Sequence, residues 1–402
     1  MNSEVPLLIQ IQEIQHSDVI KAQEMTMSWF KDELGLEVES VTLTPQPTSL
    51  NSFNGVAMLD GEEIFFKSHT EPDSAITEYY NSNILSDAGY NVVKPLRSEH
   101  VLDQQIVFYP VIKSRVMFDI MHEIDVEGDI KVPKDIVLKA EEDDCKKILG
   151  IYKSTLKKIS AKDNSGAPVH QLFWHRLTGK RFKSFYDNSS LILLDGESIP
   201  VETILNSHWI INGVQQPKTL NELILEATKV LDPNQESYGA IGHGDAHFGN
   251  VFLEDDAFLY FDPAFAGTHS PLLDIVKPIF HNVFAQWMYF PKDIANNLDF
   301  DIAIDDGKIV VDYSNVFPNI RKELYDVKKV TLLEPLLNLL SEQGESTSEM
   351  KQKIDLALMC CPLLTLNLMD TKRFPTEISW LGFALCLQMG NGHDEQNYSF
   401  NS

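Results

Sequence analysis

The sequence predicts an α+β protein in two parts: a small β-rich part, followed by a larger and mainly helical part. Short apolar segments with strand-like alternation recur between residues 38 and 111, whereas long segments with helical periodicity dominate after residue 118. A chain of 402 residues is long for a single hydrophobic core. We therefore expect one domain over residues 1–115 and a second over residues 116–402.

The first part is expected to hold two helices and five strands. An amphipathic helix is predicted over residues 18–34, ending near Gly35, and a second from about residue 73 to 85. The second and third strands are joined by the turn Asp60-Gly61. The predicted strands are residues 38–44, 56–59, 62–68, 92–96 and 104–111.

The second part is expected to be built mostly from helices. One hairpin is predicted there, from residues 300–304 and 308–313. The basic and aromatic segment 175–186 has two interpretations: a solvated loop, or a segment that binds a phosphate or an anionic group of a substrate. The predicted helices are residues 137–160, 220–231, 274–284, 316–340, 349–370 and 376–389.

The strongest functional signal is the stretch Ile241-Gly-His-Gly-Asp-Ala-His-Phe-Gly-Asn250. It holds Asp245 and Asn250, and Asp262 follows twelve residues later, after a predicted hairpin. Both polar clusters are therefore expected at one end of that hairpin. Phosphoryl transfer uses such a set, because one carboxylate orients the attacking hydroxyl while a carboxylate and an amide oxygen hold Mg²⁺ on the phosphates.

The pattern H-G-D-x-H-x-G-N has the Asp-to-Asn spacing of the protein-kinase catalytic loop. It resembles the aminoglycoside phosphotransferase and small-molecule kinase superfamily, which includes choline, homoserine, methylthioribose and fructosamine kinases. The resemblance implies a two-lobed protein-kinase-like fold, with a five-stranded antiparallel sheet and one crossing helix in the small lobe. It further implies that Asp245 is the catalytic base, that Asn250 and Asp262 bind Mg²⁺, and that Asp274 braces the catalytic loop. The implied reaction transfers the γ-phosphate of ATP to a hydroxyl of a small molecule, either a metabolite or an aminoglycoside-like antibiotic.

Two residues of the first part are candidates for nucleotide binding. Alternation along the third strand places Lys67 on the face opposite Phe66, and the resemblance makes Lys67 the candidate that contacts the ATP phosphates. The alternative is a surface lysine. Glu78, in the following helix, is the candidate partner of Lys67, with Glu71 as a competitor.

The segment expected to cover the phosphates, residues 44–55, departs from the protein-kinase pattern. It contains one glycine, Gly55, so G-x-G-x-x-G is absent, and backbone amides or the hydroxyls of Ser49 and Ser52 are the remaining candidates. The strand over residues 104–111 has the order expected for the strand that leads into the adenine-binding hinge, where Pro110 removes one donor.

Two other functions are alternatives to the kinase. His243, Asp245 and His247 alternate as H-x-D-x-H, which is compatible with a zinc or iron hydrolase. That interpretation leaves Asn250 and Asp262 without a role. A non-catalytic regulatory protein of the same fold is the other alternative, and the intact Asp, Asn and Asp of the motif argue against it.

Composition limits the partners and the compartment. The formal net charge of −26 opposes binding to nucleic acid or to an anionic membrane surface. The same charge permits a cationic acceptor, whereas the basic segment 175–186 argues against one. The four cysteines form no C-x-x-C pair and are expected to be reduced core residues. No signal peptide is recognised, and the apolar stretch 356–369 is too short to span a bilayer. We therefore expect a cytoplasmic enzyme with access to ATP.

Overall fold

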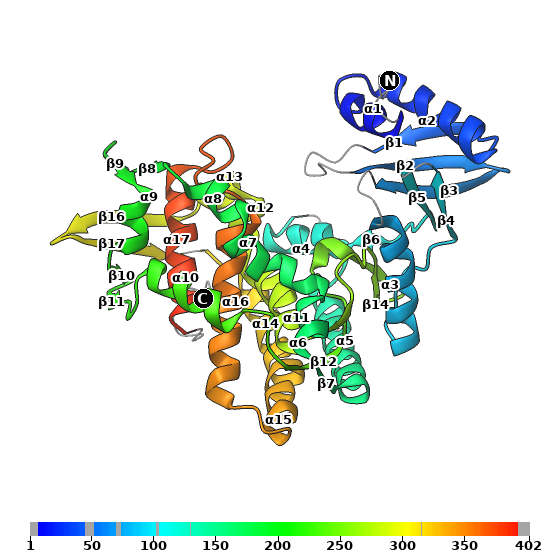
Figure 1. The fold of residues 1–402 in the computed structure, drawn as a ribbon. Coiled ribbons are helices and arrows are strands. Elements are labelled where there is room, and N and C mark those ends of the chain that lie inside the picture. The colour runs from blue at the N-terminus through cyan, green and yellow to red at the C-terminus, as the bar shows by residue number, and fades with distance from the viewer. Residues whose placement is uncertain are drawn as a thin grey trace. The chain divides into compact units, whose positions relative to one another are not determined.

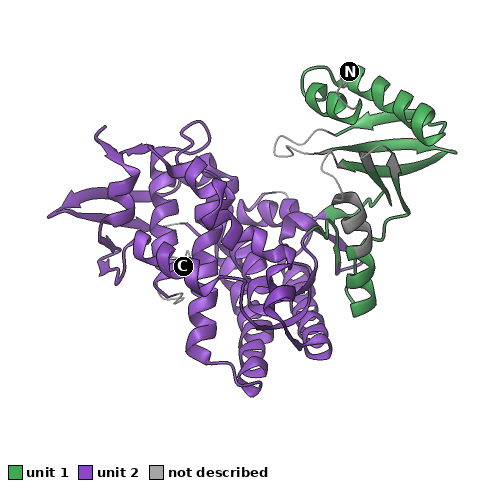
Figure 2. Cartoon of the chain, in the orientation of Figure 1, with its two compact units in different colours: residues 1–115, 259–264 green, residues 116–258, 265–402 purple. Residues whose placement is uncertain are grey.

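The computed structural model describes residues 7–44, 52–69, 74–101, 104–128, 130–314 and 316–392. The chain divides into two compact units, one of residues 1–115 with 259–264 and the other of residues 116–258 with 265–402 (Figure 2). The segment 259–264 thus belongs to the first unit, although it comes late in the sequence. The predicted class, α+β with a small antiparallel sheet and a larger, mainly helical part, is confirmed.

The first unit is a five-stranded sheet with helices (Figure 1). The strand order is β1-β2-β3-β5-β4, and every neighbouring pair is antiparallel. Its elements are α1 (Leu7–Ile14), α2 (Val19–Leu34), β1 (Ser40–Leu43), β2 (Ser52–Leu59), β3 (Glu62–His69), α3 (Ser74–Ala88), β4 (Arg97–Val101) and β5 (Gln104–Pro110).

Helix α2 forms where the sequence predicts it, because its first and last turns both carry capping residues. The Asp18 side chain accepts a hydrogen bond from the backbone N–H of Lys21, and Gly35 ends the helix in the left-handed conformation. Phe30 packs edge-on against Phe66 of β3, with 5.0 Å between ring centroids. This contact places Phe66 on the core face of β3 and leaves Lys67 on the opposite face.

The strand predicted over residues 92–96 is wrong. Val92 and Val93 are buried, but they form only an isolated bridge beside Tyr260, and β4 starts at Arg97. Strand β4 is polar because it lies at an edge of the sheet, where one side of the strand has no neighbour. Apolar alternation therefore pointed to the wrong segment.

The second unit is mainly helical (Figure 1). The helices that follow residue 115 are α4 (Met117–Asp125), α5 (Lys134–Thr155), α6 (Ala161–Ser165), η1 (Pro168–Leu172), α7 (Trp174–Thr178), α8 (Lys180–Tyr186), α9 (Val201–Asn206), α10 (Leu220–Val230), η2 (Phe248–Asn250), α11 (Pro271–Ile279), η3 (Phe280–Phe284), α12 (Gln286–Tyr289), α13 (Pro291–Ala295), α14 (Asn319–Lys328), η4 (Lys329–Leu333), α15 (Glu334–Glu342), α16 (Thr347–Thr365) and α17 (Thr376–Gly390).

Short strands are interspersed among these helices. The predicted hairpin of β16 and β17 is confirmed, and β10 joins it in parallel to give the order β11-β10-β17-β16. A second sheet has the order β15-β12-β7. The strands from residue 115 onward are β6 (Arg115–Val116), β7 (Lys157–Ile159), β8 (Ser190–Ile192), β9 (Ser198–Pro200), β10 (Trp209–Ile211), β11 (Val214–Gln215), β12 (Ser237–Gly242), β13 (Val251–Glu254), β14 (Ala257–Tyr260), β15 (Gly267–His269), β16 (Asp299–Asp305) and β17 (Lys308–Ser314).

Two predictions for this unit need correction. The helix expected to reach residue 160 ends at Thr155, because residues 157–159 leave it to pair with β12. The basic segment 175–186 is not a loop: it forms most of α7 and the whole of α8.

The core of the second unit is made largely by α11, α16 and α17. Nearly every residue of α17 is buried, including Trp380 and Phe383, so this helix is apolar on all sides. All four cysteines are free and buried, as predicted. Within the described residues, no helix combines the length and the apolar character needed to cross a membrane.

Candidate active site

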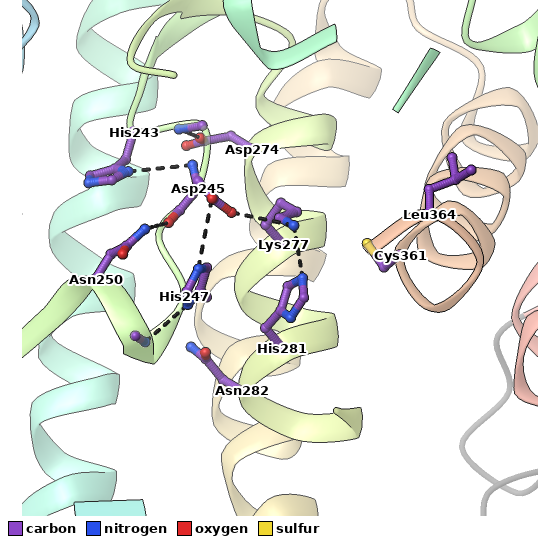
Figure 3. A network of polar contacts seen from close by, with 12 residues as sticks. His243, Asp245, His247, Asn250, Asp274, Lys277, His281, Asn282, Cys361 and Leu364 are labelled. Carbon is purple, nitrogen blue, oxygen red and sulfur yellow. Dashed lines mark hydrogen bonds and ion pairs between the residues drawn. The ribbon is translucent and has the colours of Figure 1, made fainter. Parts of the chain in front are cut away.

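The motif of residues 241–250 starts at the end of β12 and continues as a loop that closes with the turn η2 before β13 (Figure 3). Two glycines give this segment its shape. A Cβ on Gly242 would lie 2.3 Å from Oδ2 of Asp274. Gly244 has a left-handed φ of +82°, and a Cβ there would lie 2.3 Å from the carbonyl oxygen of Phe265. The loop can therefore approach α11 and residue 265 only because both positions lack a side chain.

Asp274, in the first turn of α11, anchors this loop. Its carboxylate accepts hydrogen bonds from Gly244 N (2.5 Å), from His269 Nε2 (3.0 Å) and from the Tyr152 hydroxyl. Burial alone would raise the pKa of Asp274, but the hydrogen bonds from His269, Tyr152 and Gly244 hold that pKa below its ordinary value. The contact with Gly244 is the bracing that the sequence resemblance implied for Asp274.

Asn250 is oriented by the loop itself. Its side-chain Nδ2 donates to the backbone carbonyl of Asp245 at 2.9 Å, and its backbone N–H donates to the carbonyl of His247 at 2.7 Å. A carbonyl partner can only accept, so the amide nitrogen must face Asp245 and Oδ1 must face away. The side-chain oxygen of Asn250 is thereby left as an acceptor, as a hard cation requires.

The carboxylate of Asp245 lies among cationic groups. Lys277 Nζ is 3.4 Å from its Oδ1, His247 Nε2 is 3.8 Å from its Oδ2, and 16% of the Asp245 side chain is exposed. Burial alone would raise the pKa of Asp245, but Lys277, His247, His243 and Arg176 lower it below its ordinary value. Asp245 is therefore ionised at neutral pH and can accept a proton.

Lys277 connects Asp245 to a second polar group. The Lys277 side chain is 5% exposed, and its Nζ lies 2.8 Å from Nε2 of His281, whose Nδ1 is 2.7 Å from the Tyr289 hydroxyl. Burial and the positive charge of Lys277 hold the pKa of His281 well below its ordinary value. The imidazole is therefore neutral and accepts from the ammonium at Nε2, which leaves its proton on Nδ1.

Sequence reasoning missed Lys277, His281 and Asn282, although a signal was present. Asn282 Oδ1 accepts from Phe248 N at 2.8 Å, so it also holds the loop. Together with Asp274, these residues have the spacing i, i+3, i+7 and i+8 on a segment that is otherwise apolar. Such spacing puts polar groups on one helix face, and polar residues on a buried face need partners.

The two loop histidines support the backbone of the loop. His243 Nδ1 accepts from Asp245 N at 3.4 Å, and His247 Nδ1 accepts from Gly249 N at 3.0 Å. Among the residues that the structure describes, no group of three or more His, Cys, Asp or Glu side chains is arranged to hold a metal ion. Both histidines therefore accept hydrogen bonds from backbone N–H groups of the loop.

The remaining predicted residues belong to the first unit. Lys67 Nζ forms an ion pair with Asp262 Oδ1 at 2.9 Å, and the two side chains are 16% and 38% exposed. The segment that carries Asp262 is tied to this unit by Val93 N, which donates to Tyr260 O (2.8 Å), and by Asn81 Nδ2, which donates to Pro263 O (3.0 Å). Lys67 and Asp262, 195 residues apart in sequence, are thus brought together.

Several predicted nucleotide contacts lie outside the described residues. Glu78 is part of α3, but its side chain is among those that the structure does not describe, and Glu71 and Ser49 lie outside the described ranges. Ser52 starts β2 with its side chain likewise outside the description. Gly55 is in β2, where a Cβ would lie 2.3 Å from Thr42 O, so it serves strand packing.

No protein-family model and no curated protein matches this chain. Solved structures match most of it: spectinomycin phosphotransferase APH(9)-Ia, solved with ADP and spectinomycin, is 13% identical over 91% of this chain and 98% of its own, with a TM-score of 0.40. Aminoglycoside phosphotransferase APH(4)-Ia is 9% identical over 92% and 99%, with a TM-score of 0.48. A putative fructosamine-3-kinase from Haemophilus somnus 129PT is 9% identical over 90% and 96%, with a TM-score of 0.47.

The matched proteins come from the same group of phosphotransferases and small-molecule kinases that the H-G-D-x-H-x-G-N motif resembles. Identities of 9–13% and TM-scores below 0.5 transfer no activity and no residue role to this chain. The chemistry of the site therefore has to be argued from its own residues.

Proposed function

We propose that this protein is an ATP-dependent phosphotransferase that phosphorylates a hydroxyl group of a small molecule. The observation that carries the proposal is the state of Asp245. Its carboxylate is held ionised by Lys277, on a loop that Asp274 fixes through Gly244. A general base needs this combination of a fixed position and an available lone pair.

Asp245 would accept a hydrogen bond from the hydroxyl of the acceptor and take its proton late, as the loose transition state of phosphoryl transfer develops. Lys277 would keep the carboxylate ionised before the reaction. After proton transfer Asp245 is neutral, and the ammonium of Lys277 retains its hydrogen bond to His281. The pair therefore does not need to rearrange during the step.

Three residues would supply the chemistry for nucleotide and Mg²⁺. The carboxylate of Asp262 and the side-chain oxygen of Asn250 are each a donor of the kind that Mg²⁺ prefers, so each residue is a candidate ligand of the ion. When bound, Mg²⁺ would neutralise negative charge on the ATP phosphates. Lys67 is the candidate cation for the phosphates, and its ion pair with Asp262 keeps the ammonium in place when no nucleotide is bound.

The test is Mg²⁺-dependent ATP consumption by the purified protein with a panel of hydroxylated acceptors, namely aminoglycosides, choline, homoserine, methylthioribose, sugars and hydroxy acids. We expect acceptor-stimulated turnover that falls by about a thousandfold in Asp245→Asn while ATP still binds. The same turnover should disappear in Asp262→Ala. Asp256→Asn, an exposed residue in the β13–β14 turn, is the matched control. Near-normal turnover in Asp245→Asn, or no ATP binding by the native chain, would refute the proposal.

A further inference from the structure

The second unit contains an open basic recess of about 480 Å³ beside α7 and α8. It is lined by Gln171, His175, Arg176, Arg181 and Phe265, which come from η1, α7, α8 and the segment before β15. Among the lining residues that the structure describes there are two arginines and no acidic side chain, in a chain whose formal net charge is −26. The recess is therefore a local exception to the charge of the molecule.

Arg176 is the unusual group in this lining. It is half-buried, and its guanidinium forms no hydrogen bond or ion pair with any residue that the structure describes. Burial, together with the nearby charge of Arg181, lowers the pKa of Arg176 to about 10, and Asp245 opposes this shift only in part. Because an arginine retains its charge at neutral pH, the recess holds positive charge, and no carboxylate is among its described lining residues.

Arg181 lies near enough to Arg176 for its charge to act on that residue, and two contacts orient its side chain. Its Nη1 donates to the carbonyl oxygen of Leu364 in α16 at 3.3 Å, and its guanidinium lies 5.9 Å from the centre of the Phe185 ring. Fixing two like charges close together is unfavourable unless an anion lies between or beside them. An anion that binds beside the two arginines would offset their repulsion.

The recess adjoins the loop that carries Asp245. The carbonyl of Phe265, a lining residue, packs against Gly244, the residue before Asp245. The charge of Arg176 also acts on Asp245 and on His281. A ligand seated on Arg176 would therefore lie beside the candidate base, and all of these residues belong to the second unit.

We propose that this recess binds an anionic group, a carboxylate or a phosphate, that is carried by the hydroxylated acceptor, with Arg176 and Arg181 as its partners. The guanidinium fork matches the oxygen pairs of carboxylates and phosphates and binds them through parallel hydrogen bonds. This inference rests on the proposed phosphotransferase function and specifies its substrate class. The acceptor is then a hydroxy acid or a sugar phosphate, not a cationic aminoglycoside.

Four probes with the same six-carbon polyol chain test the inference: gluconate, sorbitol 6-phosphate, neutral sorbitol and cationic glucamine. Binding to the full chain is measured by titration calorimetry without nucleotide. We expect gluconate or sorbitol 6-phosphate to bind at least about tenfold more tightly than sorbitol and glucamine, because hydrogen bonds to charged groups contribute that much.

Variants assign the binding to the recess. Arg176→Gln and Arg181→Gln should each weaken binding of the anionic probe by about tenfold or more. Arg176→Lys keeps the charge without the fork, and an intermediate loss there would exclude misfolding as the cause. Lys183→Gln, an exposed lysine of α8, is the matched control and should change binding less than about twofold.

The inference is overturned if sorbitol or glucamine binds as tightly as the anions, if no anion binds, or if both arginine variants bind the anions normally. These outcomes are separate from failure of the proposed function. Anion binding without ATP turnover would refute the phosphotransferase and keep the recess as an anion site. Turnover with neutral or cationic acceptors alone would support the phosphotransferase and refute the anion site.

Discussion

Replacing Lys277 with methionine tests the link between Lys277 and Asp245. Nζ and Oδ1 are 3.4 Å apart, and the side chains are 5% and 16% exposed. With an effective dielectric constant of about 20, two unit charges at this separation attract each other by about 5 kcal/mol. Desolvation of both groups offsets part of that attraction, and removing one partner of a buried pair costs about 3–5 kcal/mol.

We expect the lower end of this range, because His247 and Arg176 also act on Asp245. Lys277→Met should therefore lower the free energy of unfolding of the second unit by about 3 kcal/mol at pH 7. A double-mutant cycle with Asp245→Asn isolates the pair, and we expect a coupling energy of about 2–3 kcal/mol. Lys292→Met, which alters an exposed lysine, should change stability by less than about 0.5 kcal/mol.

The coupling energy should depend on pH with a defined sign. The folded-state pKa of Asp245 lies below its ordinary value, so the folded protein binds fewer protons than the unfolded chain near pH 4. The stabilisation is therefore fully present above the unfolded-state pKa of about 4, and it is lost as the pH falls through the folded-state pKa.

Urea unfolding followed by tryptophan fluorescence is the assay. Urea carries no charge and does not screen the pair. Four of the five tryptophans, Trp174, Trp209, Trp287 and Trp380, report on the second unit. A coupling energy below about 0.5 kcal/mol at pH 7 would contradict the ion pair. So would a coupling that grows as the pH falls from 6 to 4.

Two further predictions concern the backbone of the catalytic loop. Gly244→Ala combines a left-handed φ of +82° with a Cβ that would lie 2.3 Å from Phe265 O. We therefore expect the free energy of unfolding to fall by about 3 kcal/mol or more. Urea unfolding measures this loss, with Gly213→Ala as the control. Gly213, whose φ is +74°, has open space around its Cβ position and should lose only about 1 kcal/mol; equal losses would refute the clash. Asp274→Asn puts an amide where three donors converge, so it should lower the free energy of unfolding by about 2–4 kcal/mol and remove most of the turnover. The control Asp187→Asn, at an exposed residue, should have no effect. Normal turnover in Asp274→Asn would contradict the bracing role of Asp274.

The elements predicted well are those whose signals are local. Helix α2 has Asp18 and Gly35 at its ends, and the β16–β17 hairpin has Asp306 and Gly307 at its turn, where both residues adopt positive φ. The strand predicted at residues 92–96 does not form, because Val92 and Val93 are buried beside Tyr260 in an isolated bridge and not in a sheet. Tertiary contacts decided that case, and alternation cannot report them.

The residues of the candidate site also differ in how clearly the sequence indicates them. Asp245, Asn250 and Asp262 could be named because a short motif fixes their spacing, and Lys67 because alternation gives its face. Lys277 and Arg176 do not belong to the motif. The polar spacing along residues 274–282 and the basic segment 175–186 marked the regions that hold them, but neither pattern shows that they act on Asp245. Each of the two residues acts on Asp245 but is 32 residues or more away from it in sequence. Only the folded second unit brings them near Asp245.

Helix α11 and the π-helical turn η3 that continues it set both the position and the charge of the candidate catalytic loop. Asp274 holds Gly244, Lys277 holds the carboxylate of Asp245, and Asn282 holds Phe248. The wider π turn starts at Phe280, and such turns recur at functional sites. Because the three contacts come from one continuous helical segment, a shift of this segment changes the geometry of the candidate base and its ionisation together. Variants in α11 should therefore alter turnover and its pH dependence in parallel, whereas variants of Arg176 should alter acceptor affinity first.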